Sequence, residues 1–412
     1  MSLILFAIPF FLCCIAIELY TSRRMGKQVY RFHDAMTSLN IGFISETIRS
    51  IVKLMTIVVY ALVLDQVASV SWDVSQPAVW IVAFFMYDFF YYWAHRSGHE
   101  VNLLWASHVV HHSSEEFNLS TALRQSWTNQ IFYWVFYLPM AIVGIPVTVF
   151  VITALISALY QFWSHTRLVG KLGWMDRVFV TPSNHRCHHG RNPYCIDKNY
   201  GGILIVWDRL FGTYAEERDD EPVVYGTLTP LNSWSPLWGN VKNYVGIWHE
   251  IGATSGWTNK LMVIFAPPGW QPNSNAQVIT HMEHRPRFET ACTKGQVIYG
   301  MWAASAILAF TLDLLIHATQ MGWPARIAYT ILMVLSTTSL SRLFEGRRHA
   351  LGFETARSIF FYSALIMGQW FYAVPMAGRA AGFLGLLISL ILLASLRKEA
   401  IQSWTEKSEG VA

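Results

Sequence analysis

The chain has 412 residues, of which 53% are hydrophobic and only 14% are charged, and its mean hydropathy is +0.32. A soluble protein carries about 25% charged residues, so this composition excludes a disordered chain, a fibrous repeat and an ordinary soluble enzyme. The net charge is only +4, and the sequence contains no long block of Lys and Arg. Both features argue against a nucleic-acid partner. With 18 Trp, 18 Tyr and 25 Phe, the composition predicts an integral membrane protein with aromatic residues at its bilayer interfaces.

Three apolar segments in the first hundred residues predict membrane helices: Ser2–Tyr20, about Ile51–Val70 and about Ala78–Trp93. The first lacks the preceding basic residues and the cleavage site of a secretory signal. It is followed at once by basic residues, which places that end on the cytoplasmic side by the positive-inside rule. These residues are Arg23, Arg24, Lys27 and Arg31.

The apolar stretch 131–160 is interrupted by Pro139, Gly144 and Pro146, so that each half is shorter than the ~20 residues of a full span. We expect a hairpin that enters and leaves on one face. Residues from about 161 to 297 are polar and rich in turn-forming types, which predicts a water-exposed or interfacial part. Four further apolar segments predict C-terminal membrane helices, at about 297–317, 327–341, 357–376 and 379–396. The predicted fold is therefore an all-α, polytopic membrane protein.

Nine of the fifteen histidines lie between residues 95 and 189. They form one His-x3-His group, two His-x2-His-His groups and one single histidine. They are His95, His99, His108, His111, His112, His165, His185, His188 and His189. On a helix, residues three and four apart share a face, whereas adjacent histidines point ~100° apart and can serve two metals.

The number of histidines predicts at least two metal ions, since nine imidazoles exceed the four ligands of a zinc site and the six of an octahedral ion. Imidazole binds zinc, iron, copper and nickel. Two six-coordinate ions would keep positions open for O2 or water, whereas structural zinc sites are closed. Helices that bring such a site to the bilayer suit chemistry on a lipid. These arguments favour a redox pair such as iron.

At these motifs the chain resembles the membrane fatty acid hydroxylase/sterol desaturase superfamily, whose members carry a His-x3-His box and two His-x2-His-His boxes. The resemblance covers about residues 75 to 230. Within the superfamily it points to the branch that cleaves the ether bond of alkylglycerols. It is carried by the stretches Tyr87–Glu100, His111–Ser126, Tyr160–Thr166, Thr181–Tyr200 and Trp207–Thr213.

The resemblance implies that the nine histidines bind two iron ions and that Glu100 is important for catalysis. Glu100 would either orient a ligand histidine or contact the metal or a proton directly, and the alternative is a carboxylate paired with a nearby arginine. Asp88 lies two helical turns before His95 and is a candidate to accept a ring N–H from a ligand histidine; the alternative is a polar group near a helix end. Asn184 departs from the pattern, because a histidine is expected before His185.

The apolar segments and the resemblance together predict four regions: N-terminal membrane helices (1–74), a di-iron catalytic domain (75–230), a polar interfacial segment (231–296) and C-terminal membrane helices (297–412). The implied reaction is O2-dependent hydroxylation and cleavage of an alkylglycerol ether, with a lipid substrate, two iron ions and an electron donor, which the family implies to be tetrahydrobiopterin. The charge pattern places the histidines on the cytoplasmic side, in the endoplasmic reticulum of a eukaryote or the inner membrane of a bacterium.

Three alternatives remain open at this point. The first is hydroxylation or desaturation of a fatty acid, sterol or carotenoid. The second is a zinc-dependent membrane hydrolase. The third is a metal transporter or metal-binding scaffold, although transporters place their ligands inside the bilayer, whereas these boxes follow the membrane segments on one side.

Overall fold

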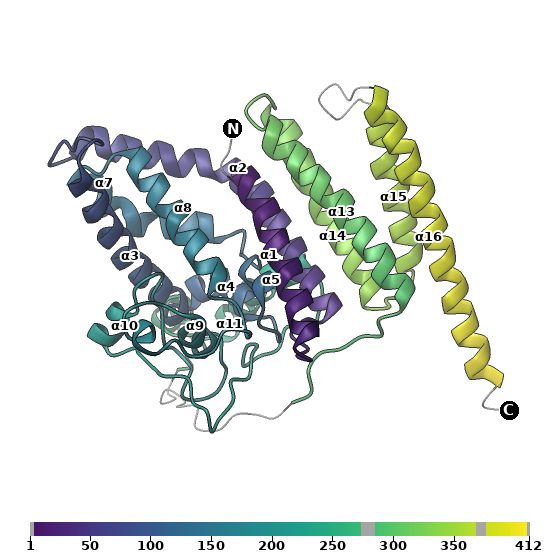
Figure 1. The fold of residues 1–412 in the computed structure, drawn as a ribbon, viewed down its shortest axis with the longest axis horizontal. Coiled ribbons are helices and arrows are strands. Elements are labelled where there is room, and N and C mark those ends of the chain that lie inside the picture. The colour runs from purple at the N-terminus through teal and green to yellow at the C-terminus, as the bar shows by residue number, and fades with distance from the viewer. Residues whose placement is uncertain (1–3, 273–284, 368–375, 410–412) are drawn as a thin grey trace.

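The computed structural model describes residues 4–272, 285–367 and 376–409 (Figure 1). This described part is all-helical, as predicted, and its only β pairing consists of two isolated bridges, Phe179 with Leu204 and Gly190 with Tyr225. The α-helices are α1 (Ile4–Arg24), α2 (Phe32–Val67), α3 (Pro77–Glu100), α4 (Asn102–His112), α5 (Leu119–Ala122), α6 (Asn129–Phe132), α7 (Leu138–Val143), α8 (Val147–Trp163), α9 (Pro182–His188), α10 (Val206–Phe211), α11 (Pro236–Ala253), α12 (Trp257–Phe265), α13 (Lys294–His317), α14 (Trp323–Phe344), α15 (Ala350–Met367) and α16 (Met376–Glu409). Two 3-10 helices are η1 (Tyr133–Tyr137) and η2 (Gly173–Arg177).

Helices α3, α7 and α8 pack with α2 around an apolar core whose members include Tyr60, Val79, Met140 and Val149. The predicted break in the 131–160 stretch is present, because α7 ends at Gly144 with φ +94°. A Cβ atom at Gly144 would lie 1.8 Å from the carbonyl oxygen of Val70. Only glycine therefore allows this turn between α7 and α8.

The C-terminal helices α13 to α16 lie side by side, and α13 and α14 also pack against α2 (Figure 1). Their core contains Tyr299, Ile307, Phe310 and Leu340. By length and composition, three stretches of the described chain can cross a membrane: Lys294–His317, Trp323–Phe344 and Arg379–Glu399. Shorter apolar helices lie at Thr56–Val67, Asn129–Val143 and Val147–Trp163.

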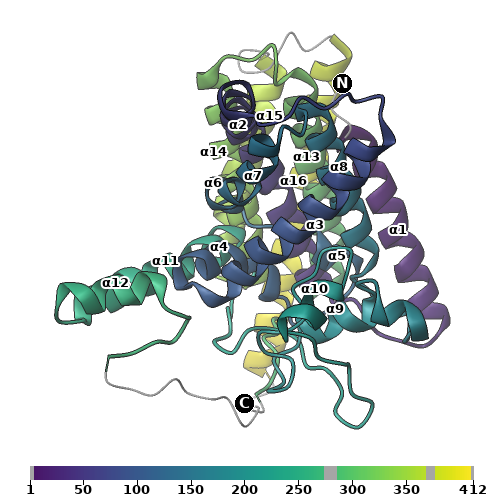
Figure 2. The same cartoon turned by 90° about the vertical axis from the view of Figure 1, so that its left-hand side faces the viewer.

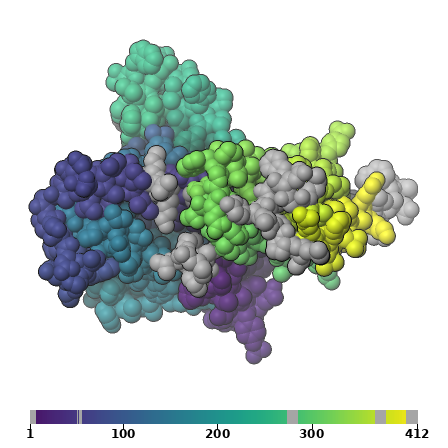
Figure 3. Space-filling view, turned by 90° about the horizontal axis from the view of Figure 1, so that it is seen from above, coloured from purple at the N-terminus to yellow at the C-terminus, as the bar shows by residue number. Residues whose placement is uncertain are grey.

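Two elements differ from the sequence-based expectation. Helix α2 begins at Phe32, well before the expected segment near Ile51, because its first turns carry buried polar residues that a hydropathy window does not detect. The expected polar region 231–296 contains the helices α11 and α12, which project from the side of the bundle (Figures 2 and 3). Residues 273–284 of that region, and most of 368–376 in the expected third C-terminal segment, lie outside the described residues.

Candidate metal centre

The nine predicted histidines come from four elements that meet at one end of α3. His95 and His99 lie in the last turns of α3, and the next three lie on α4, which starts directly after an extended residue at 101. His165 follows the end of α8, and the last three belong to α9 and its C-terminal cap. Both α3 and α9 begin with a proline, Pro77 and Pro182, at the first helical position, where its missing N–H costs nothing.

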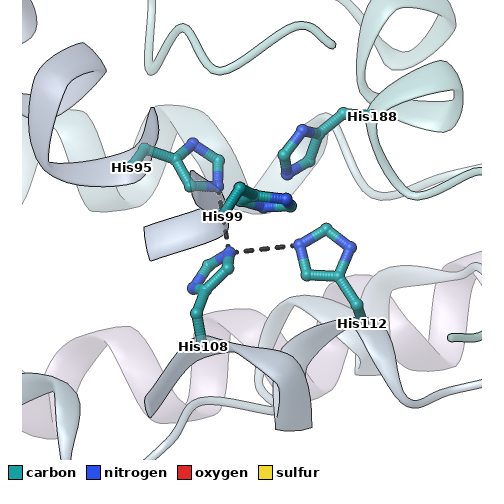
Figure 4. A group of neighbouring side chains, drawn as sticks. All are labelled: His95, His99, His108, His112 and His188. Atoms are coloured by element: carbon teal, nitrogen blue, oxygen red, sulfur yellow. Dashed lines mark hydrogen bonds between the residues drawn. The ribbon is translucent and has the colours of Figure 1, made fainter. Parts of the chain in front are cut away.

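The structure sorts the nine histidines into two groups, and in each group the candidate ligand atoms all lie within 4.8 Å of one another. Every one of the nine is buried. The first group (Figure 4) consists of His95, His99, His108, His112 and His188. The second group consists of His111, His165, His185 and His189. The groups adjoin, since the rings of His112 and His189 stack with centroids 4.3 Å apart, so the arrangement is consistent with a di-metal site.

The inward-facing nitrogens of each group come very close together. In the first group, Nε2 of His108 lies 3.0 Å from Nε2 of His95 and 3.1 Å from Nε2 of His112. In the second group, Nε2 of His165 lies 3.0 Å from Nε2 of His185. A shared cation held by the lone pairs of these nitrogens explains why several imidazoles converge on one point.

The outward-facing nitrogens of four rings donate to backbone carbonyls. Nδ1 of His95 donates to the Tyr200 oxygen at 2.8 Å, and Nδ1 of His188 donates to the Lys198 oxygen at 2.9 Å. His165 donates in the same way to Gln161, and His111 donates to Arg124. Because a carbonyl can only accept, Nδ1 carries the proton and Nε2 keeps its lone pair. These backbone oxygens therefore fix the tautomer that a metal ligand requires.

Three further ring nitrogens support a bound metal. Nε2 of His99, His188 and His189 is buried and has no hydrogen-bond partner among the described residues. An unsatisfied buried polar atom costs about 1–3 kcal/mol. A metal ion that accepts these lone pairs removes the cost, so the residues fit a metal centre.

Burial also keeps these rings neutral. Burial, followed by the nearby histidines, lowers the pKa of His95 to about 3, and burial lowers the pKa of His165 to about 4. The pKa values of His108, His111 and His112 are lowered well below their usual range for the same reason. Neutral imidazole is the form that binds a metal, so at neutral pH these ligands are ready to bind without losing a proton.

These pKa shifts predict acid sensitivity of the metal-free protein. Below a pH of about 6.5 the unfolded chain binds protons that the buried histidines of the folded chain cannot bind, so stability falls as the pH drops toward 4. We expect the thermal unfolding temperature of chelator-treated protein to decrease over this range. The slope should be shallower in a His165→Asn variant and unchanged in His249→Asn, an exposed position on α11. A flat profile in the unmodified chain would contradict the argument.

The predicted residue Asp88 anchors a loop of the metal centre. Its carboxylate accepts from the backbone N–H groups of Ile203 (2.7 Å) and Leu204 (3.0 Å) and from the Trp207 indole (2.9 Å). Glycine at 202 permits this approach, because a Cβ atom there would lie 3.0 Å from the Asp88 carboxylate. The same loop carries the Tyr200 carbonyl that orients His95. Among the described residues no histidine ring is bonded to Asp88, so it acts on the ligands through this loop.

The carboxylate of Glu100 is placed at the end of α3 and belongs to neither group of donor atoms. It accepts from Nε of Arg96 at 2.9 Å, and its side chain is 39% exposed. The structure thus shows the pairing with a nearby arginine. The catalytic role of Glu100 stays a prediction.

A Glu100→Gln variant tests whether Glu100 is a metal ligand or only the ion-pair partner of Arg96. We expect it to retain its full metal content, because the carboxylate lies outside both groups, and to lose no more than about 1 kcal/mol of stability, because the ion pair is partly exposed. Metal analysis and thermal unfolding of the purified variant check this. Loss of metal from Glu100→Gln would instead make the residue a ligand.

Sequence reasoning missed three buried carboxylates that bond to residues adjoining the metal centre. Asp208 accepts from the Tyr200 and Gly201 N–H groups, both at 2.7 Å, and burial raises its pKa to about 6. Asp34 lies 3.3 Å from the guanidinium of Arg124. Glu18 on α1 accepts from the hydroxyl of Thr166, next to the ligand candidate His165. Asp208 stands in a stretch that the resemblance covered, whereas the other two lack any local signal.

Comparison with known proteins agrees with this geometry. The fatty acid hydroxylase family model matches residues 80–213, the part of the chain that contains both histidine groups. Alkylglycerol monooxygenase of Xenopus tropicalis is 38% identical over 362 residues, which cover 86% of this chain and 80% of that protein. The chain belongs to the fatty acid hydroxylase family. It is therefore an oxidoreductase of that family, a membrane enzyme with histidine-box metal sites.

Other relatives in this family show how far the similarity extends. Alkylglycerol monooxygenase of Homo sapiens is 36% identical over 382 residues, covering 91% of this chain and 85% of the relative. Ornithine lipid hydroxylase OlsE of Rhizobium tropici is 31% identical over 128 residues, covering 31% of this chain and 39% of the relative. No solved structure matches the chain significantly.

Proposed function

We propose that this fatty acid hydroxylase family member is an O2-dependent di-iron monooxygenase that cleaves the ether bond of alkylglycerols. The observation that carries the substrate class is the extent of similarity. It covers 80% or more of both chains for two relatives named alkylglycerol monooxygenase, but only 31% of this chain for the ornithine lipid hydroxylase.

The nine histidines would hold the two iron ions, one in each group. When bound, the iron pair supplies activation of O2 for oxygen insertion at the carbon beside the ether oxygen. The chain's own residues prepare that step. Backbone carbonyls of Tyr200 and Arg124 hold the ligand tautomers, Asp88 and Asp208 fix the loop that carries Tyr200, and burial keeps bulk water away from the ligand nitrogens.

The balanced reaction needs one O2, two electrons and two protons for each ether bond. One oxygen atom enters the C–H bond next to the ether oxygen and the other leaves as water. The resulting hemiacetal breaks its C–O bond, which gives a fatty aldehyde and a free glycerol hydroxyl. We propose tetrahydrobiopterin as the electron donor. We also propose the cytoplasmic side as the location of the histidines, because basic residues lie in the last turns of α1 and α14 and just after these helices.

Product analysis tests this proposal. Detergent-purified protein loaded anaerobically with Fe(II) should release a fatty aldehyde from an alkylglycerol only when O2 and tetrahydrobiopterin are both added. Hydroxylated or desaturated product from a fatty acid or sterol, without aldehyde from the ether, would replace the proposal by the hydroxylase alternative. Turnover with zinc alone and without O2 would replace it by the hydrolase alternative.

A further inference from the structure

A polar pocket lies apart from the histidine groups, at the membrane-surface end of α14. It has a volume of about 610 Å3 and lies between the last turns of α14 and the first turn of α11. Its floor and walls include three arginines, Arg342, Arg347 and Arg348, and one carboxylate, Glu345. None of the nine histidines lines it, so a ligand bound there is independent of the proposed function.

The charges in this pocket do not cancel. Glu345 is fully engaged, because it accepts from the hydroxyl of Ser233 (2.6 Å), the N–H of Trp234 (2.7 Å) and Nε of Arg347 (2.7 Å). Arg342 and Arg348 have no carboxylate partner in the described part of the chain. The pocket therefore has an excess of two positive charges, which attracts an anion.

Hydrogen-bond donors also face the space between the helices. The hydroxyl of Thr338 lines the pocket and is buried without any partner among the described residues. The 18-residue helix α11 begins at the pocket, and the side chain of Ser235 caps it by accepting from the Trp238 N–H. The positive end of that helix adds to the attraction for an anion. Guanidinium, hydroxyl and helix end together match the oxygens of a phosphate group.

The same face of α14 continues as an apolar surface. Leu335, Ile331 and Ile327 follow Thr338 toward the N-terminus at spacings of three or four residues, so they share one face of the helix. Each is about half exposed, at 57%, 54% and 48%. Because α14 is long and apolar enough to cross a membrane, this surface contacts acyl chains. Trp238 at the pocket rim suits the headgroup level.

We propose that the pocket binds the phosphate of a membrane phospholipid, with Arg342 and Arg348 on the phosphate and one acyl chain along the exposed face of α14. The pocket is the site for the anion. The phosphate is assigned to a lipid because the exposed Leu335, Ile331 and Ile327 continue from the pocket and can contact an acyl chain. Such a lipid joins the C-terminal bundle to α11, which in turn contacts α4 of the metal centre.

Native mass spectrometry of the full chain in detergent tests the proposal. The probes are dioleoyl phosphatidylglycerol, glycerol 3-phosphate and inorganic phosphate. We expect one phosphatidylglycerol per chain at the site, with its affinity reduced tenfold or more in an Arg342→Gln/Arg348→Gln variant, since two charge-assisted contacts are lost. Thr338→Val removes only the buried hydroxyl at similar volume and should weaken binding several-fold.

The matched control is Arg397→Gln/Lys398→Gln, which removes two exposed positive charges of α16 outside the pocket. It should bind the lipid as the unmodified chain does. Equal loss of affinity in both double variants would overturn the proposal, because it would reflect only overall charge. Displacement of the lipid by glycerol 3-phosphate or inorganic phosphate at comparable concentration would overturn the lipid assignment and make the site one for soluble phosphate. Unfolding temperatures of all variants establish that each remains folded.

Discussion

A His111→Ala variant is expected to bind about one metal ion less than the unmodified chain and to reduce the proposed aldehyde formation by more than 100-fold. His111 is 4% exposed and belongs to the second group, where its Nε2 lies 3.3 Å from Nε2 of His165. Its removal takes away one of the four candidate ligand nitrogens of that group, which weakens metal binding there. Loss of a partner that merely orients a ligand already costs 10–100-fold in affinity or activity, so loss of the ligand itself costs more.

Metal analysis of purified protein after anaerobic iron loading, together with the aldehyde assay, measures both effects. His249→Ala, an exposed histidine on α11, is the matched control and should keep about two ions per chain. His111→Asn keeps a polar side chain of similar size and guards against collapse of the site. Retention of the full metal content by both His111 variants would remove this residue from the set of ligands.

The histidine pattern allowed much of this centre to be predicted from the sequence. Neighbouring histidines on a helix point about 100° apart, and the structure places His111 in one group and His112 in the other, as it does for His189 and His188. Local geometry accounts for that division. It does not determine which box joins which, because α3, α4, α8 and α9 meet only through tertiary packing.

The supporting residues could not be predicted, because their partners are far away along the chain. Glu18 and Thr166 are separated by 148 positions, and Asp34 and Arg124 by 90. Neither carboxylate stands in a motif: Glu18 lies in the segment predicted as the first membrane helix, and Asp34 lies between two predicted segments. The early start of α2 escaped detection because the buried polar residues of its first turns interrupt the apolar run.

An Asp34→Ala variant is expected to lose about 3–5 kcal/mol of stability, because it leaves the buried guanidinium of Arg124 without its charge partner. Arg124 is 1% exposed and its Nη1 lies 3.3 Å from the Asp34 carboxylate. The other carboxylate oxygen accepts from the hydroxyl of Ser114 at 2.6 Å. Chemical or thermal unfolding of the metal-free protein in detergent measures the loss.

The Asp34→Ala change should also weaken metal binding, because the backbone oxygen of Arg124 accepts from Nδ1 of His111 at 3.2 Å. A displaced Arg124 loses this contact, so metal affinity of the second group should fall while that of the first group is kept. In the double variant Asp34→Leu/Arg124→Met both charges are gone and apolar side chains fill the space, so most of the stability should return. A loss below 1 kcal/mol in Asp34→Ala, or no recovery in the double variant, would show that the buried pair does not hold His111 in place.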